Sequence, residues 1–486
     1  MERTEIDGVT TWWEHGPEPF TGALMFRVGT RDETFRTLQV SHLLEHLVMG
    51  SLPKSHLDRN AHITADTTTF VATGRPEQVG EFLEQVCRAL TDVPADRLAK
   101  EQGVLRAEEA DGAHPALCWA AGLRYGHTGV GLLSAEGPGA DQLSIQQVRD
   151  FAATFFVREN AVLVLTGAPP QGLALPLPSG PRPQPSASVP TGLPTPALLR
   201  VPPHAVLSFL LPREEWAGSV ARILVDRVTD DVRHGRGLAY EIDFDAARVD
   251  DEHSLVAVFT DGAEENADTI AEALWDALSS LAADGPTPEE MAHHRAGFAA
   301  YLEDPRAAAD WMEGIGSREL FGDPVLDREE SRAALAKVTA EDVRRWAQAA
   351  LPTAVLGAPP GPQGAIAGLE DRTEWLPNPP AELSEGQRFG RRLMSFAPRD
   401  LSVTVGPNGL SQTVQGDTIA GTWDDVVGVA RAAGLRVVHL RSGNAILLHG
   451  RDLKSSDRLI ALVDERTEHV AYESTEDEIL GSGFDA

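Results

Sequence analysis

Apolar positions along the first 170 residues recur with two different periods. Spacings of three and four predict helices over 35–50, 77–92, 95–110 and 144–156. Runs rich in β-branched residues and bounded by Gly, Asp or Pro predict strands over 22–30, 62–74 and 160–167. The same order recurs downstream, with strands over 205–212 and 254–262 and helices over 219–233, 266–285, 287–304 and 339–351. The repeated order predicts a duplicated α+β unit.

Two Pro-rich segments, 171–198 and 361–385, interrupt this pattern and predict linkers. They divide the chain into domains over 1–170, 199–360 and 386–486. The last domain differs from the others, with short strands predicted over 401–406, 435–440 and 445–450 and an amphipathic helix over 455–472. The predicted fold is therefore α+β, with two homologous α/β sandwich-like domains followed by a small β-rich domain.

The charge balance changes which partners are plausible. Among 486 residues there are 42 Lys and Arg against 73 Asp and Glu, a net charge of −31. Nucleic acid requires clustered positive charge, so it is not an expected partner. The acidity serves solubility, or it forms a negative interior that attracts basic peptides, and both interpretations stay open.

Other bulk features concern location. The sequence contains no apolar run of about 18 residues, so we expect no membrane span. The N-terminus lacks a basic region followed by an apolar stretch, and only two cysteines occur. A cytoplasmic location is the resulting expectation.

The predicted helix over 35–50 contains an unusual polar group within "TLQVSHLLEHLVMGS". His42 and His46 are four residues apart and share one helix face, so both imidazoles can bind one metal ion. Zn²⁺ suits such ligands, and Glu45 beside them can take a proton from water. This H-x-x-E-H spacing is the inverted zinc-protease motif. The alternative is a helix with two incidental histidines, but burying three titratable groups without a metal is costly.

A catalytic zinc usually has three protein ligands, so a third is expected later in the chain. The stretch "KEQGVLRAEEADG" offers Glu101, Glu108 and Glu109. Glu101 and Glu108 are seven residues apart, two helical turns, and would share a face. The alternative for these residues is an ordinary solvated acidic face.

These motifs resemble the insulinase/pitrilysin inverzincins, most closely the bacterial relatives of mitochondrial processing peptidase, over about residues 5–360. The resemblance implies Glu108 as the third zinc ligand and Glu101 as a residue that supports a ligand. "NAHITADTTTF" resembles the family's strand where substrate peptides add alongside, which assigns substrate binding to Asn60 and Ala61. "VRHGRGLAY" resembles the segment that supplies an Arg and a Tyr to the active site.

In this chain those two residues are Arg233 and Tyr240, which the resemblance makes catalytic. The interval between His46 and Glu108 is shorter than the family's usual one. The missing part falls between residues 50 and 60, where a deletion is tolerable and would trim the substrate groove.

The resemblance implies a zinc metalloendopeptidase that cleaves short or unfolded peptides by water activated at Zn²⁺, with Glu45 as general base. It also implies a homodimer or a pair with a homologous subunit. The alternative is a catalytically idle binding or assembly subunit with the same fold. The last domain resembles bacterial pleckstrin-homology-like barrels through "IAGTWDDVVGVAR". It is interpreted as a docking module for a partner or lipid head group, or as a domain that stabilises the dimer.

Overall fold

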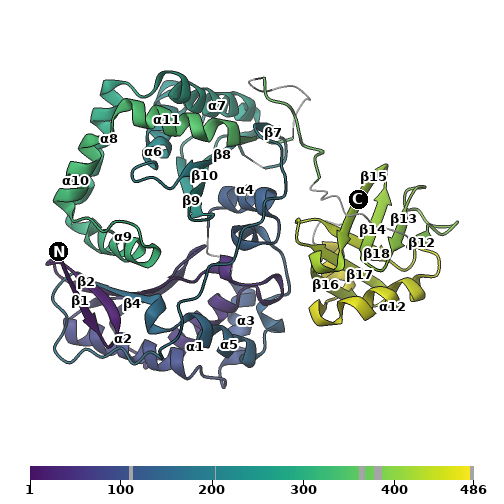
Figure 1. The fold of residues 1–486 in the computed structure, drawn as a ribbon, viewed down its shortest axis with the longest axis horizontal. Coiled ribbons are helices and arrows are strands. Elements are labelled where there is room, and N and C mark those ends of the chain that lie inside the picture. The colour runs from purple at the N-terminus through teal and green to yellow at the C-terminus, as the bar shows by residue number, and fades with distance from the viewer. Residues whose placement is uncertain (109–112, 203, 361–365, 367, 377–385, 482–486) are drawn as a thin grey trace.

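The structure, a computed structural model, describes residues 1–108, 113–202, 204–360, 366, 368–376 and 386–481. Two large α/β units lie one above the other in Figure 1, and a smaller β-rich unit lies beside them. The first unit contains a six-stranded sheet in the order β1 (Glu2–Ile6), β2 (Val9–Trp13), β6 (Ala161–Leu165), β3 (Phe20–Phe26), β5 (Thr68–Gly74) and β4 (Asp58–Ile63).

The second unit repeats this sheet without a counterpart of β1. Its strand order is β7 (Ala197–Leu199), β11 (Val355–Gly357), β8 (Val206–Pro212), β10 (His253–Thr260) and β9 (Ile242–Arg248). In each sheet the first equivalent pair is parallel, β2 with β6 and β7 with β11, and the following pairs are antiparallel. The predicted duplicated unit is confirmed at the level of strand order and direction.

The central strands β3 and β6 are buried at every position because both faces of the sheet are covered. In β3, Leu24 and Phe26 pack into the main core of the first unit, whereas Ala23 and Met25 face a second core on the opposite side. Successive strand residues point to opposite faces, so a continuous apolar run indicates a strand buried on both sides. The main core of the first unit is covered by α1 (Val40–Ser51), α2 (Pro76–Thr91), α3 (Leu98–Ala107) and α5 (Ile145–Phe155).

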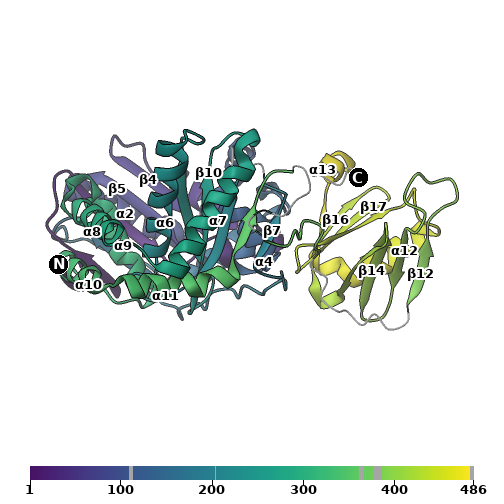
Figure 2. The ribbon, with the colours of Figure 1, turned by 90° about the horizontal axis from the view of Figure 1, so that it is seen from above.

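The two large units exchange helices across their opposite sheet faces. Helix α4 (Pro115–Tyr125) of the first unit packs Leu117 and Ala121 against Leu255 and Phe259 of β10. Helix α9 (Ala308–Phe321) of the second unit packs Trp311 and its neighbours against β3 and β6. Neither helix was predicted from the sequence. Each sheet is therefore completed by the other unit, and the pair forms one interlocked body (Figures 1 and 2).

The remaining helices of the second unit cover its main core. They are α6 (Ser219–Val228), α7 (Ala267–Asp284), α8 (Pro288–Glu303), α10 (Arg328–Lys337) and α11 (Ala340–Ala350). Helix α6 continues directly into η6, a π-helical turn over Thr229–Gly235.

The Pro-rich segment predicted as a linker over 171–198 is packed rather than free. Leu175 and Leu177 are buried in the core of the first unit, and Arg182 donates a hydrogen bond to the carbonyl of Leu320 in α9. Arg31 donates to the carbonyl of Ser186 in this segment and to that of Val249 in the second unit. The segment therefore helps to join the two units, which a Pro-rich composition alone does not reveal.

The C-terminal unit contains two four-stranded sheets and its own core. Their orders are β12 (Gln387–Gly390), β13 (Ser402–Val405), β14 (Gly409–Val414), β15 (Asp417–Thr422), and β18 (Ala445–His449), β17 (Leu435–Leu440), β16 (Val426–Ala432), β19 (Ala471–Glu473). Helices α12 (Ser456–Thr467) and α13 (Glu476–Gly481) complete the unit. The predicted α+β class, with two homologous domains and a small β-rich domain, is confirmed.

The C-terminal unit contacts the first unit just before the H-x-x-E-H helix. The ring of Phe35 lies 4.7 Å from those of both His127 and His439. His127 also bonds through Nδ1 to the carbonyl of Leu440 at 2.9 Å. Within the described parts of the chain, no helix is long and apolar enough to cross a membrane.

Some predicted boundaries were wrong. The strand predicted over 62–74 is a hairpin, β4 and β5, joined by a turn in which Thr64 N donates to Thr67 O. The helix predicted over 455–472 ends with α12 at Thr467, and the chain then forms β19, which pairs with β16. In both cases strand pairing with distant residues decided the outcome, and local sequence does not specify it.

Candidate metal centre

The H-x-x-E-H segment lies on α1, whose two faces differ sharply. Leu43 and Leu47 are fully buried in the core of the first unit. His42 and His46 lie on another face, with ring centroids 4.8 Å apart, as expected for residues separated by one turn. Glu45 is next to His46, with 3.7 Å between its Oε2 and the Nε2 of the imidazole. The apolar face fixes the helix against the sheet, and this presents the polar group to the space outside the core.

The start of α1 is held by Glu33, which the sequence interpretation did not include. Its buried carboxylate accepts hydrogen bonds from the backbone N–H of Gln39 and of Ser41, at 2.8 and 3.0 Å, and from the Ser41 hydroxyl. It thus does the work of an N-cap, because Gln39 at that position makes no side-chain capping bond. Burial raises the pKa of Glu33 to about 7, although these hydrogen bonds favour the ionised form. The sequence has no usual N-cap residue directly before α1, and this absence was the signal that another side chain, such as Glu33, caps the helix.

Helix α3 brings two of the candidate carboxylates to α1. The Oε2 of Glu101 lies 3.7 Å from Nδ1 of His46, and Oε1 accepts a 2.6 Å bond from Arg97. Glu108 follows the last residue of α3 as its C-cap, so the two glutamates do not share one continuous helix as predicted. Glu109, the neighbouring alternative, lies outside the described residues.

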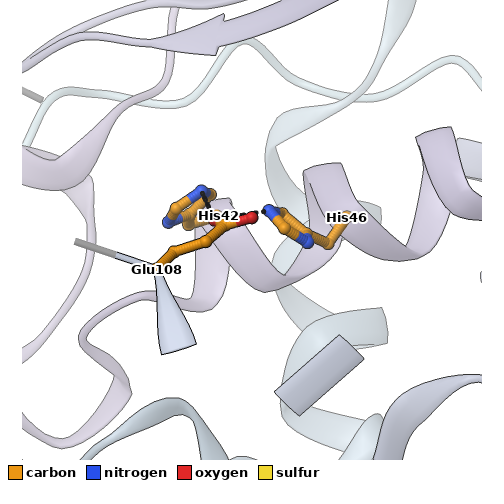
Figure 3. A group of neighbouring side chains, drawn as sticks. All are labelled: His42, His46 and Glu108. Carbon is orange, nitrogen blue, oxygen red and sulfur yellow. Dashed lines mark ion pairs between the residues drawn. The ribbon is translucent and has the colours of Figure 1, made fainter. Parts of the chain in front are cut away.

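His42, His46 and Glu108 form a compact group of potential metal ligands (Figure 3). Their ligand atoms all lie within 4.8 Å of one another. Glu108 Oε2 is 3.2 Å from His46 Nε2 and 3.7 Å from His42 Nε2. Ligands at about 2.0–2.1 Å from a tetrahedral Zn²⁺ are about 3.3 Å apart, so small side-chain adjustments would fit the ion. Two imidazoles and a carboxylate are also a set that zinc favours.

The charges around this group favour a cation. Glu45 and Glu101 are nearly buried beside the exposed carboxylate of Glu108. Burial, and then the charges of Glu108 and Glu101, raise the pKa of Glu45 to about 7. Three carboxylates gathered in a partly buried space repel one another, and a positive ion among them would relieve that repulsion.

Asn60 and Ala61 lie on β4, the edge strand of the first sheet. Strand β4 pairs with β5 on one side, and among the described residues no strand pairs with its other side. A free edge presents unpaired N–H and C=O groups to which an extended peptide can bond. On the same strand, Nε2 of His62 lies 3.3 Å from Oε2 of Glu313 in α9, so a helix of the second unit contacts this edge strand.

Arg233 and Tyr240 lie in the second unit, Arg233 within η6 and Tyr240 shortly before β9. The Arg233 guanidinium is 4.6 Å from the centre of the Tyr240 ring, and the Tyr240 side chain is 74% exposed. The structure therefore brings these two predicted residues together. Of the contacts made by the described residues, none joins either one to His46 or Glu108.

Comparison with known proteins identifies the fold. No protein-family model matches the sequence, and no curated protein matches it either. Solved structures do match. A chain of complex III2 from Candida albicans has TM-score 0.58 and 14% identity, covering 73% of this chain and 95% of that one. A protease from Helicobacter pylori has TM-score 0.58 and 13% identity, covering 74% and 99%. The inactive peptidase M16 domain from Pseudomonas fluorescens has TM-score 0.58 and 16% identity, covering 75% and 99%.

The two large units thus have the fold of M16-type peptidases. The chain is also similar to the periplasmic protease PqqL from Escherichia coli, with TM-score 0.56 and 14% identity. That match covers 88% of this chain but 56% of PqqL. At these identities the likeness establishes the fold alone, and the chemistry has to be argued from this chain's own residues.

Proposed function

We propose that this protein is a zinc-dependent endopeptidase that cleaves short or unfolded peptides. The observation that carries the proposal is the cluster of His42, His46 and Glu108, with Glu45 beside it. The H-x-x-E-H spacing supplies two ligands from one helix, and the third comes from a separate helix end. A fold-conserving scaffold has no need for this geometry.

Each residue has a distinct part in the proposed reaction. His42, His46 and Glu108 would hold Zn²⁺, which when bound supplies a Lewis acid that polarises a carbonyl and makes water more acidic. Glu45 would take a proton from the attacking water and deliver it to the leaving nitrogen. Glu101, whose Oε2 lies 3.7 Å from Nδ1 of His46, would help to orient that ring, and Arg97 holds Glu101 by a hydrogen bond.

The substrate class follows from the edge strand. A peptide that adds to β4 beside Asn60 and Ala61 must be extended, because its own backbone has to pair with the strand. A folded protein offers few such segments, whereas a short or unfolded peptide offers many. Asn60 is exposed and Ala61 half-buried, so the strand presents backbone and small side chains to the peptide.

Arg233 and Tyr240 are proposed to hold the scissile carbonyl oxygen as negative charge develops on it. Both are exposed and stacked on each other, so they are available for such a contact. In the proposed reaction they would act when the two units close over the peptide or when a second chain approaches.

A second chain is part of the proposal. This chain spans 56% of PqqL, and the first half of PqqL, solved alone, matches it with TM-score 0.53 over 91% of that half. A homodimer would supply the same amount of peptidase fold as one whole PqqL chain. A pair with a homologous subunit is the alternative.

The competing function is an idle binding or assembly subunit. Two similar structures favour this possibility, one described as an inactive M16 domain and one belonging to complex III2. The ligand cluster separates the two functions, because an idle subunit has no requirement for it.

Metal content and peptide digestion test the proposal together. The purified protein should contain about one Zn²⁺ per chain and cleave members of a diverse peptide library, read by mass spectrometry. Glu45→Gln should retain zinc and lose cleavage, whereas His46→Ala and Glu108→Gln should lose both. Glu109→Gln is the matched control for Glu108→Gln and should retain both. A wild-type protein that binds no zinc after metal supplementation, or a fully active Glu45→Gln variant, would refute the proposal.

A further inference from the structure

The most exposed large apolar side chains in the described parts of the chain lie close together in the C-terminal unit. Leu393, Met394 and Phe396 are 89%, 90% and 106% exposed, and we call them the apolar tip. They occupy the loop that joins β12 to β13. Scattered apolar residues on a surface are normal, but three fully exposed ones within four positions form a patch that needs an explanation.

The loop holds the apolar tip outward by turning its polar groups inward. Ser395, between the apolar residues, donates a 2.5 Å hydrogen bond to Asp452 and accepts one from the Ala397 N–H at 3.0 Å. Arg391 donates to the carbonyl of Ala397 at 2.7 Å, and Arg392 to that of Leu453 at 2.8 Å. These bonds fix the loop at both ends and in the middle. The exposure of the tip is therefore a built feature of the loop.

The loop is also basic in a chain that is strongly acidic overall. Arg388, Arg391, Arg392 and Arg399 lie between β12 and β13 or on β12 itself, and Asp400 is the one acid between the same strands. Among the described residues, none of the four arginines forms an ion pair. Three of them bond to carbonyl or hydroxyl oxygens and not to carboxylates. The four arginines therefore outnumber the two acids at the loop, Asp400 and the Asp452 that accepts from Ser395. Local charge is thus opposite in sign to the net charge of −31.

We propose that this loop docks the protein on the surface of an anionic lipid bilayer. The apolar tip would enter the boundary between headgroups and acyl chains, and the arginines behind it would meet the negative headgroups. One apolar anchor gives only marginal binding, so a second, electrostatic signal is what makes surface binding effective. The loop and the adjoining strand β12 carry both signals within residues 388–399.

A bilayer fits this surface better than a folded partner does. The tip projects outward, so a protein acceptor would need a matching apolar pocket ringed by acids, whereas a bilayer deforms around it. Strand β12 lies at the side of the C-terminal unit away from the two peptidase units (Figures 1 and 2), so docking would leave those units free. At physiological salt the screening length is about 8 Å, so the loop's own charge outweighs the distant acidic surface.

Vesicle flotation of the full-length protein tests this inference. The wild type should float with phosphatidylcholine vesicles that contain phosphatidylglycerol, and at least about tenfold less with phosphatidylcholine alone. Serine at all three tip positions should reduce flotation with anionic vesicles at least about tenfold. The matched control is Val201→Ser, which removes an exposed apolar side chain elsewhere and should leave flotation unchanged.

The charge contribution is tested separately with Arg399→Glu, since among the described residues Arg399 forms no hydrogen bond that holds the loop. It should weaken flotation with anionic vesicles several-fold and leave the thermal unfolding midpoint unchanged. The triple-serine variant should also keep its midpoint, because the replaced side chains contact little. Failure of the wild type to float, or equal flotation of the triple-serine variant, would overturn the inference. So would loss of a protein complex or dimer in that variant with no vesicle binding by the wild type.

Discussion

Glu33 offers a direct test of how the fold supports the candidate metal centre. The carboxylate is buried and satisfies two backbone N–H groups and one hydroxyl at the start of α1. Glu33→Ala leaves these three donors without a protein partner. An unsatisfied buried donor costs about 1–3 kcal/mol, and water entering the new cavity would recover part of it. We therefore expect the free energy of unfolding to fall by roughly 3–5 kcal/mol.

The same substitution should weaken metal binding. His42 lies in the first turn of α1, which the Glu33 bonds hold, whereas His46 lies one turn further on. Fraying of that turn must be reversed before both imidazoles can bind. A cost of about 1.4 kcal/mol corresponds to a tenfold change, so zinc affinity should fall at least about tenfold.

Urea unfolding and a competition assay with a zinc chelator measure the two effects. Ser41→Ala is the matched control, because it removes one of the three donors and should cost about 1 kcal/mol. The double variant should be less destabilised than the sum of the two, since the residues share an interaction. A Glu33→Ala protein within 1 kcal/mol of the wild type, or strict additivity, would refute the capping role.

Three further predictions concern the second unit, the assembly and the C-terminal unit. Tyr240→Phe should lower kcat at least about tenfold with zinc content unchanged, and wild-type kinetics would confine the chemistry to the first unit. Light scattering should show a dimer at assay concentrations, and an active monomer would contradict the proposed assembly. Burial lowers the pKa of His127 from 6.5 to about 4 and, with the nearby charge of His127, that of His439 to about 3. A lowered pKa means that the packed rings bind a proton less readily than the same rings in the unfolded chain. Their contribution to the free energy of unfolding is therefore complete above pH 6.5 and is lost as pH falls towards 4, by about 3 kcal/mol for His127. The protection factor for hydrogen exchange at this contact, which corrects for the slower intrinsic exchange at low pH, should therefore fall on acidification, and His127→Gln should flatten that dependence.

The part of the candidate metal centre that the sequence determined is local. His42, Glu45 and His46 lie within two turns of one helix, so helical periodicity alone places them on neighbouring positions. The repeated order of strands and helices likewise predicted the duplicated unit, because each element's apolar pattern reports its own burial.

Only the tertiary structure shows which of the described carboxylates lie beside the two imidazoles. Glu108 lies 3.2 Å from His46 because α3 packs beside α1 and ends at that point, and the sequence offered several glutamates without choosing by geometry. The packing of α4 and α9 against the sheet of the other unit could not be predicted either. An apolar helix face indicates that the helix is buried on one side, but not which sheet it packs against. Phe396 shows the same limit of sequence-based prediction. Its apolar side chain favours burial, but its residue type does not tell that the fold leaves it exposed.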